Sequence, residues 1–130
     1  LNDEAQCQEY IARVLSPVGR VLQAVAAEPG LIQHPGGEAR AIAVVEALRG
    51  AVRATIARSQ APVFDFFVAC FDSLLIVQSA GTGSAQISRL VLRLTEEIVA
   101  AQACFLCSAQ QAILCRHCLR VVNVYAISGR

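Results

Sequence analysis

Two Cys-x-x-Cys pairs lie close together near the end of the chain, Cys104 with Cys107 and Cys115 with Cys118. Four thiolates form the ligand set of a structural zinc site, in which each pair usually occupies a tight turn. Both pairs here fall within apolar patterns of helical period, which favours reduced cysteines that pack as small hydrophobic side chains. A zinc site or a disulfide-stapled helical domain built on these four cysteines is the alternative. The favoured interpretation requires no cofactor.

The other residues of chemical interest have no partners nearby in the sequence. His117 stands between Arg116 and Cys118 with no acidic neighbour, so we expect a solvent-facing histidine on a helix. The glycine-rich run 81–84 lacks the lysine and the spacing of a phosphate-binding P-loop, and its Ser84 is expected to cap the following helix. No set of Ser, His, Asp, Glu or Cys has the pattern of a nucleophile with its base. The sequence therefore predicts a binding protein and not an enzyme.

Two pairs of like-charged residues share helical faces. Asp65 and Asp72 are seven residues apart on one predicted helix, and Arg116 and Arg120 are four apart on a later one. If these two helices are parallel neighbours, the carboxylates and the guanidinium groups face each other. The pattern fits an ion-pair ladder between helices and a strip that binds a partner protein equally well. Asp65, Asp72, Arg116 and Arg120 are therefore the partner-binding candidates.

The composition favours a protein partner over nucleic acid. Hydrophobic residues make up 55% of the 130 residues and charged residues 16%, whereas about 25% charged is usual in soluble domains. Part of this apolar surface is expected to face a partner. The net charge is +1 and every base is an arginine, spaced too widely to follow nucleic-acid phosphates.

The chain begins at Leu1 without methionine and stops after an apolar run, so we expect a fragment of a longer protein.

The longest apolar stretch, residues 61–80, has the length of a membrane-spanning helix. It carries Asp65 and Asp72, however, and a carboxylate is costly at bilayer depth. A helix buried between neighbouring helices explains the same composition with less strain. No membrane insertion is expected.

Apolar residues recur at steps of three and four over most of the chain, which predicts five helices. Pro17 interrupts the first helix, so a kink or two shorter helices meeting near Ser16 are expected. Residues 28–37, rich in proline and glycine, are expected to form a loop, and Gln60 and Pro62 a short turn. The predicted helices cover residues 3–27, 38–59, 62–80, 84–105 and 109–127.

Short connections make neighbouring helices antiparallel, so the second predicted helix pairs with the third and the fourth with the fifth. The second and fourth helices begin 46 residues apart, a spacing typical of HEAT repeats, whose two-helix units stack into a solenoid. The expected fold is all-α, a HEAT-like α-solenoid segment of about two and a half repeats. A half repeat covers residues 1–35, and two full repeats cover 36–82 and 83–130.

Four segments carry a resemblance to a known family. Residues 46–54 (EALRGAVRA) lead to 62–67 (PVFDFF), and 91–99 (VLRLTEEIV) and 118–125 (CLRVVNVY) follow. In this order the segments resemble the exportins of the importin-β (karyopherin-β) superfamily, in particular the branch that contains exportin-4 and exportin-7. The cysteine cluster has no counterpart in the family pattern.

The resemblance implies a long superhelix of HEAT repeats that shuttles between nucleus and cytoplasm. Its implied partners are protein cargo, the small GTPase Ran in its GTP form, and nuclear pore proteins. In this family the best-defined Ran contacts lie outside a segment of this kind, and helices that correspond to the third and fifth predicted here line the concave side. An unrelated HEAT-repeat scaffold with a different protein partner is the alternative.

Overall fold

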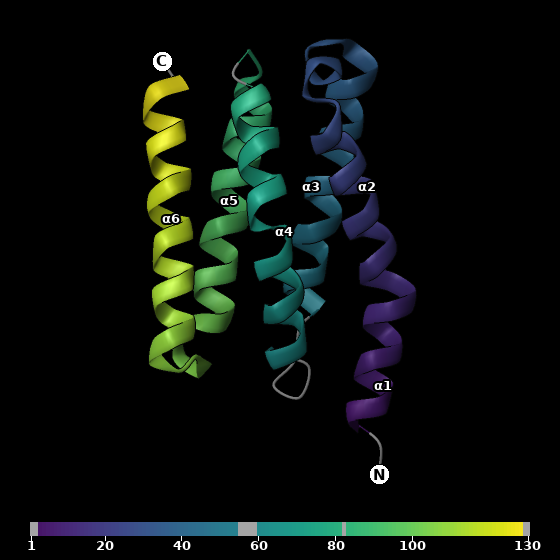
Figure 1. Cartoon of the computed structure of the whole chain (residues 1–130), viewed down its shortest axis with the longest axis vertical. Coiled ribbons are helices and arrows are strands. Elements are labelled where there is room, and N and C mark those ends of the chain that lie inside the picture. Colours follow the sequence, from purple (N-terminus) through teal and green to yellow (C-terminus); the bar gives the residue numbers. More distant parts are fainter. Residues whose placement is uncertain (1–2, 55–59, 82, 129–130) are drawn as a thin grey trace.

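The computed structural model describes residues 3–54, 60–81 and 83–128. The regular structure in these residues is helical throughout, which confirms the predicted all-α class. Three short turns, η1, η2 and η4, separate or extend the α-helices (Figure 1). In chain order the elements are α1 Asp3–Tyr10, the π-helical turn η1 Ile11–Leu15, α2 Ser16–Ala27, the 3-10 turn η2 Pro29–Gln33, α3 Pro35–Ala54, α4 Gln60–Ala80, α5 Ala85–Gln102, the 3-10 turn η4 Ala103–Phe105 and α6 Ser108–Ser128.

The helices form two layers. Helices α2, α4 and α6 lie side by side in a front layer, which α1 extends, whereas α3 and α5 contact each other in a rear layer (Figure 1). Helices of one layer run parallel, and each is antiparallel to its sequence neighbour in the other layer. The predicted antiparallel hairpins are therefore present, because short connections reverse the chain after each helix.

The first predicted helix is divided where its proline interrupts the backbone. Pro17 has no N–H to bond to the carbonyl group of Arg13, one turn earlier. The π-helical turn η1 precedes this point, and α2 begins at Ser16, so the expected division near Ser16 is confirmed. A π-helical turn absorbs the missing hydrogen bond by widening the helix locally.

Helix α3 begins earlier than predicted, so the expected loop over residues 28–37 is wrong in part. Residues 29–33 form η2, and Pro35 opens α3, because proline is well suited to the first helical position. The backbone N–H of Glu38 bonds to the carbonyl oxygen of His34 at 2.8 Å. Gln60 and Pro62, predicted as a turn, lie in the first turn of α4. The predicted end of the second helix at Ser59 lies outside the described residues.

The helix boundaries in the second half of the chain follow capping hydrogen bonds. The Oγ of Ser84 accepts the backbone N–H of Ile87 at 3.2 Å, which confirms Ser84 as the cap of α5. Helix α5 ends at Gln102, three residues earlier than predicted. At the start of α6, Gln110 Oε1 accepts the N–H of Cys107 at 3.0 Å. Ser108 is accordingly the first residue of α6.

Helix α4 lies at the centre of the core. It is in contact with α2, α5 and α6, and its Phe64, Phe67 and Leu74 are at most 1% exposed. The segment Ala61–Ala80 is long and apolar enough to cross a membrane, but 50% of it is buried inside the protein. Burial against neighbouring helices accounts for its apolar composition.

Burial patterns repeat along the chain at an offset of 50 residues. Helices α3 and α5 begin at Pro35 and Ala85, so the predicted spacing of 46 residues is replaced by 50. In the rear layer the offset relates three pairs of buried residues: Ala41 to Val91, Val44 to Leu94 and Leu48 to Ile98. In the front layer it relates Phe64 to Leu114, Phe67 to His117 and Phe71 to Val121.

Candidate protein-binding groove

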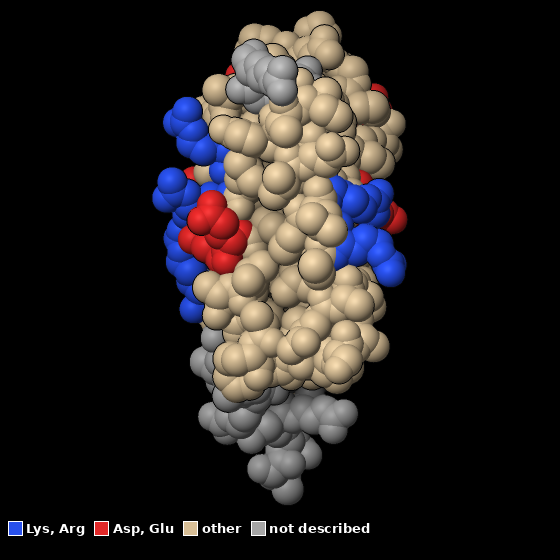
Figure 2. Space-filling model, turned by 90° about the vertical axis from the view of Figure 1, so that its left-hand side faces the viewer, with Lys and Arg blue, Asp and Glu red and all other residues tan. Residues whose placement is uncertain are grey.

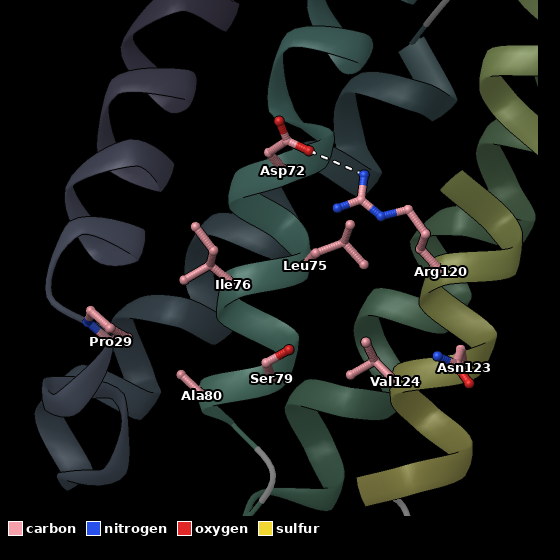
Figure 3. Close-up of a pocket in the computed structure, with 9 residues that line it drawn as sticks. All are labelled: Pro29, Asp72, Leu75, Ile76, Ser79, Ala80, Arg120, Asn123 and Val124. Atoms are coloured by element: carbon pink, nitrogen blue, oxygen red, sulfur yellow. Dashed lines mark hydrogen bonds and ion pairs between the residues drawn. The ribbon is translucent and has the colours of Figure 1, made fainter. Parts of the chain in front are cut away.

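A groove of about 790 Å³ runs along the front layer between α4 and α6 (Figure 3). Helix α4 lines the middle of the groove, α6 lines one side, and Pro29 of η2 lies on the other side of α4. The lining is mainly apolar, with Leu75 buried at its base and Ile76 43% exposed at its rim. The lining residues are Pro29, Asp72, Leu75, Ile76, Ser79, Ala80, Arg120, Asn123 and Val124.

An ion pair lies at one end of the groove. The NH1 nitrogen of Arg120 is 3.3 Å from Oδ1 of Asp72, and Figure 3 shows the two side chains pointing toward one another from α6 and α4. Their side chains are 55% and 85% exposed. An exposed pair contributes only about 0–1 kcal/mol to stability. A charged group of a partner can therefore replace either member with little loss of fold stability.

Two uncharged polar side chains lie farther along the groove. Ser79 comes from α4 and Asn123 from α6. Within the part of the chain that the structure describes, neither side chain makes a hydrogen bond. A hydroxyl and an amide supply donors and acceptors for a peptide backbone, and the apolar walls suit hydrophobic side chains.

Of the four charged residues that were predicted to bind a partner, two form an ion pair with each other and two do not. Asp72 and Arg120 pair across α4 and α6 as the parallel arrangement requires. Asp65 and Arg116 are exposed on the same helices, and no ion pair joins them within the described residues. Of the ion pairs predicted between these two helices, the described residues form one, Asp72–Arg120, and this pair borders the groove.

The prediction of a solvent-facing His117 is wrong. The residue is 3% exposed, and its ring stacks on Phe71 with a centroid separation of 3.8 Å and an interplanar angle of 6°. Burial lowers the pKa of His117 to about 4; nearby Arg120 also lowers it, whereas Asp72 raises it. The sequence contains a signal for this position, because His117 shares a helical stripe with Leu114 and Val121.

A second ion pair, not anticipated from the sequence, joins the two rear helices. Arg49 of α3 donates from Nε to Glu97 Oε1 at 2.8 Å and from NH2 to Oε2 at 3.1 Å. Glu46 accepts a further bond from Arg49 at 2.8 Å, and Arg53 lies 3.5 Å from Glu97. The hydrogen bond to Glu97 is the main reason why the pKa of Arg49 is raised, and the same bond lowers the pKa of Glu97. This cluster is structural, since it ties α3 to α5.

The structure does not bring the four clustered cysteines together as a metal site. Within the described residues no group of three or more Cys, His, Asp or Glu side chains is placed to hold a metal ion. Cys104 lies in η4 and Cys107 just before α6, both exposed, so the expectation that this pair falls in a helical apolar stripe is wrong. Cys115 is exposed as well, and burial raises the pKa of the half-buried Cys118.

No protein family, no curated protein and no solved structure matches the chain.

Proposed function

We propose that this chain is a helical-repeat segment that binds a partner protein through the groove between α4 and α6. The observation that carries the proposal is the groove itself, whose apolar base is bordered by the exposed Asp72–Arg120 ion pair. Hydrophobic contact would supply most of the affinity, and the charged pair would select the partner and its orientation. A partner segment with apolar side chains and one charged residue fits this lining.

We further propose that the segment belongs to a HEAT-like solenoid of the exportin type, most like exportin-4. Two features support this proposal: the resemblance of residues 46–54, 62–67, 91–99 and 118–125 to exportin repeats, and the layered hairpins with a 50-residue offset. Under this proposal the parent protein carries protein cargo out of the nucleus with GTP-loaded Ran and passes nuclear pore proteins. Helices α4 and α6 then line the concave, cargo-facing side.

Selection of peptides from a random display library tests the groove. Peptides that bind the wild-type chain are expected to lose about tenfold or more in affinity when Ile76→Arg places a charge at the groove rim. Leu31→Arg is the matched control, because Leu31 is 50% exposed and lies outside the groove. Equal binding to both variants, or no enriched peptide, would contradict a binding function for this groove.

A separate measurement addresses the exportin proposal. The parent protein is immobilised and offered purified Ran loaded with a non-hydrolysable GTP analogue or with GDP. Preferential capture of the GTP form supports an exportin. Equal capture of both forms, or capture of neither, contradicts it and favours a HEAT-repeat scaffold with another partner, while the groove result stands on its own.

A further inference from the structure

The two helices that form the groove carry charges of opposite sign, and the spacing of these charges differs between them. Helix α4 has two carboxylates, Asp65 and Asp72, and α6 has two guanidinium groups, Arg116 and Arg120. Of these four side chains, Asp72 and Arg120 line the groove itself. The sign of the charge that a partner brings therefore depends on which helix can bind it more strongly.

The two arginines of α6 are placed to bind one carboxylate together. Arg116 and Arg120 are four residues apart, so their Cβ atoms lie about 5–6 Å from each other on the helix surface. Arg116, Arg120 and Asn123 follow at steps of four and three, which places Arg116 on the face of α6 that lines the groove. Arg116 is exposed, and within the described residues it forms no ion pair. Its charge is therefore available to a partner.

Arg120 keeps hydrogen-bond donors available although it pairs with Asp72. The contact is made through NH1 at 3.3 Å, whereas a guanidinium group carries five N–H donors. In Figure 3 the dashed contact reaches one nitrogen of Arg120 and leaves the other two without a drawn partner. A carboxylate of a partner can therefore bind Arg120 without displacing Asp72.

Helix α4 offers less to a basic partner residue. Asp65 and Asp72 are seven residues apart, about 10 Å along the helix axis, so one ammonium group cannot contact both. The residues one turn from Asp72 are Val68 and Ile76, which are uncharged. A basic group would thus meet one carboxylate and would also face Arg120. The front-layer side of the molecule, on the right in Figure 2, accordingly shows a patch of basic side chains with acidic ones only at its edge.

We propose that the partner segment in the groove is acidic: one Asp or Glu side chain binds between Arg116 and Arg120, and apolar side chains next to it pack on Ile76 and Val124. The inference rests on the proposed function, because it names the partner class for the same groove. Asp72 then opposes the partner, since its carboxylate lies close to the incoming one and like charges repel. Neutralising Asp72 should therefore strengthen the binding of an acidic segment, whereas it should weaken the binding of a basic one.

Peptides selected on the wild-type chain from a random display library are the probe. Enriched sequences are expected to carry Asp or Glu next to apolar residues. For a synthetic copy of one such peptide, Arg116→Gln should weaken binding by about twofold to fivefold, the effect of one exposed ion pair, and Asp72→Asn should strengthen it by a similar factor. Arg93→Gln and Glu96→Gln are the controls, because they change the net charge equally at exposed positions of α5 outside the groove. Both should leave the affinity unchanged, and circular dichroism establishes that every variant remains helical.

Replacing the acidic residue of the peptide by its amide is expected to abolish the effect of Arg116→Gln, because the two groups then no longer interact. Enriched peptides that are basic or uncharged overturn the proposal. So does weaker binding to Asp72→Asn, or an effect of Arg116→Gln no larger than that of Arg93→Gln. If Ile76→Arg still abolishes binding in these cases, the groove remains a binding site and only the acidic partner is wrong. No enriched peptide, or binding that Ile76→Arg leaves intact, contradicts the groove and the acidic partner together.

Discussion

The imidazole of His117 lies flat against the ring of Phe71, with centroids 3.8 Å apart, and this stack joins α6 to α4. Both residues are buried, and neither nitrogen of His117 has a hydrogen-bond partner among the described residues. The imidazole therefore serves as a flat apolar ring in the core, at the position that Phe67 occupies one 50-residue offset earlier. A charged imidazolium does not suit this site, because burial disfavours the ionised form.

The free energy of unfolding should decrease as the pH is lowered, because His117 then becomes protonated. The pKa is about 4 in the folded chain and about 6.5 in an unfolded one, so between these values the unfolded state binds more protons. The stability that comes from keeping His117 neutral is fully present above a pH of about 6.5. As the pH falls toward 4, the free energy of unfolding is expected to decrease by about 3 kcal/mol. Urea unfolding at pH 7.5, 6, 5 and 4 measures the decline.

His117→Phe is expected to remove most of the decline between pH 6.5 and 4.5, because phenylalanine cannot take up a proton. His34→Gln is the control: His34 is exposed in the connection before α3, and its replacement should keep the decline. If the wild type and His117→Phe lose stability in parallel over this range, His117 does not remain neutral in the folded chain.

At pH 7.5, His117→Phe should leave the free energy of unfolding unchanged or raise it by about 1–2 kcal/mol. The substitution keeps a flat ring against Phe71 and removes two buried nitrogens that have no partner, and an unsatisfied buried polar group costs about 1–3 kcal/mol. His117→Ala deletes the ring and is expected to destabilise the chain by about 2–4 kcal/mol. A less stable His117→Phe variant would indicate that the nitrogens do have a bonding role.

The helices and their apolar stripes were predictable from the sequence, because they depend on local spacing. Ser84 marks a helix boundary through its side-chain hydroxyl and Pro17 through its missing backbone N–H, and both predictions are confirmed. The buried position of His117 was not predicted, because its neighbour Arg116 indicates an exposed face whereas the stripe that His117 shares with Leu114 and Val121 indicates a buried one. The Arg49–Glu97 pair joins residues 48 apart in the chain, and no local pattern identifies it. Of the residues that line the groove, only Asp72 and Arg120 were predicted from the sequence. The groove itself was not predicted, because it depends on how α4 and α6 pack.

The two inter-helix ion pairs should differ in their contribution to stability. Glu97 accepts two hydrogen bonds from Arg49, whose side chain is 12% exposed, whereas the Asp72 side chain is 85% exposed. Glu97→Gln is expected to lower the Tm by about 3–8 °C, and Asp72→Asn by less than about 2 °C. Because the pKa of Glu97 is lowered in the folded chain, its contribution is present at neutral pH and is lost on acidification below the ordinary glutamate range. Thermal unfolding at pH 7.5 compares the variants, and equal Tm values would show that the Arg49 cluster is as weak as the surface pair.

Two adjacent glycines at the start of α3 should respond in opposite ways to alanine. A Cβ added at Gly37 would collide with the carbonyl oxygen of Leu31 in η2, whereas one added at Gly36 meets nothing within 4 Å. The obstacle at Gly37 is backbone, so η2 has to move away from α3, and we expect Gly37→Ala to destabilise the chain by about 1–3 kcal/mol. Gly36→Ala should be neutral or stabilise by up to about 1 kcal/mol, because alanine restricts the unfolded chain and favours helix. Urea unfolding of both variants gives the difference; if Gly37→Ala is as stable as Gly36→Ala, η2 does not pack against α3 as closely as described.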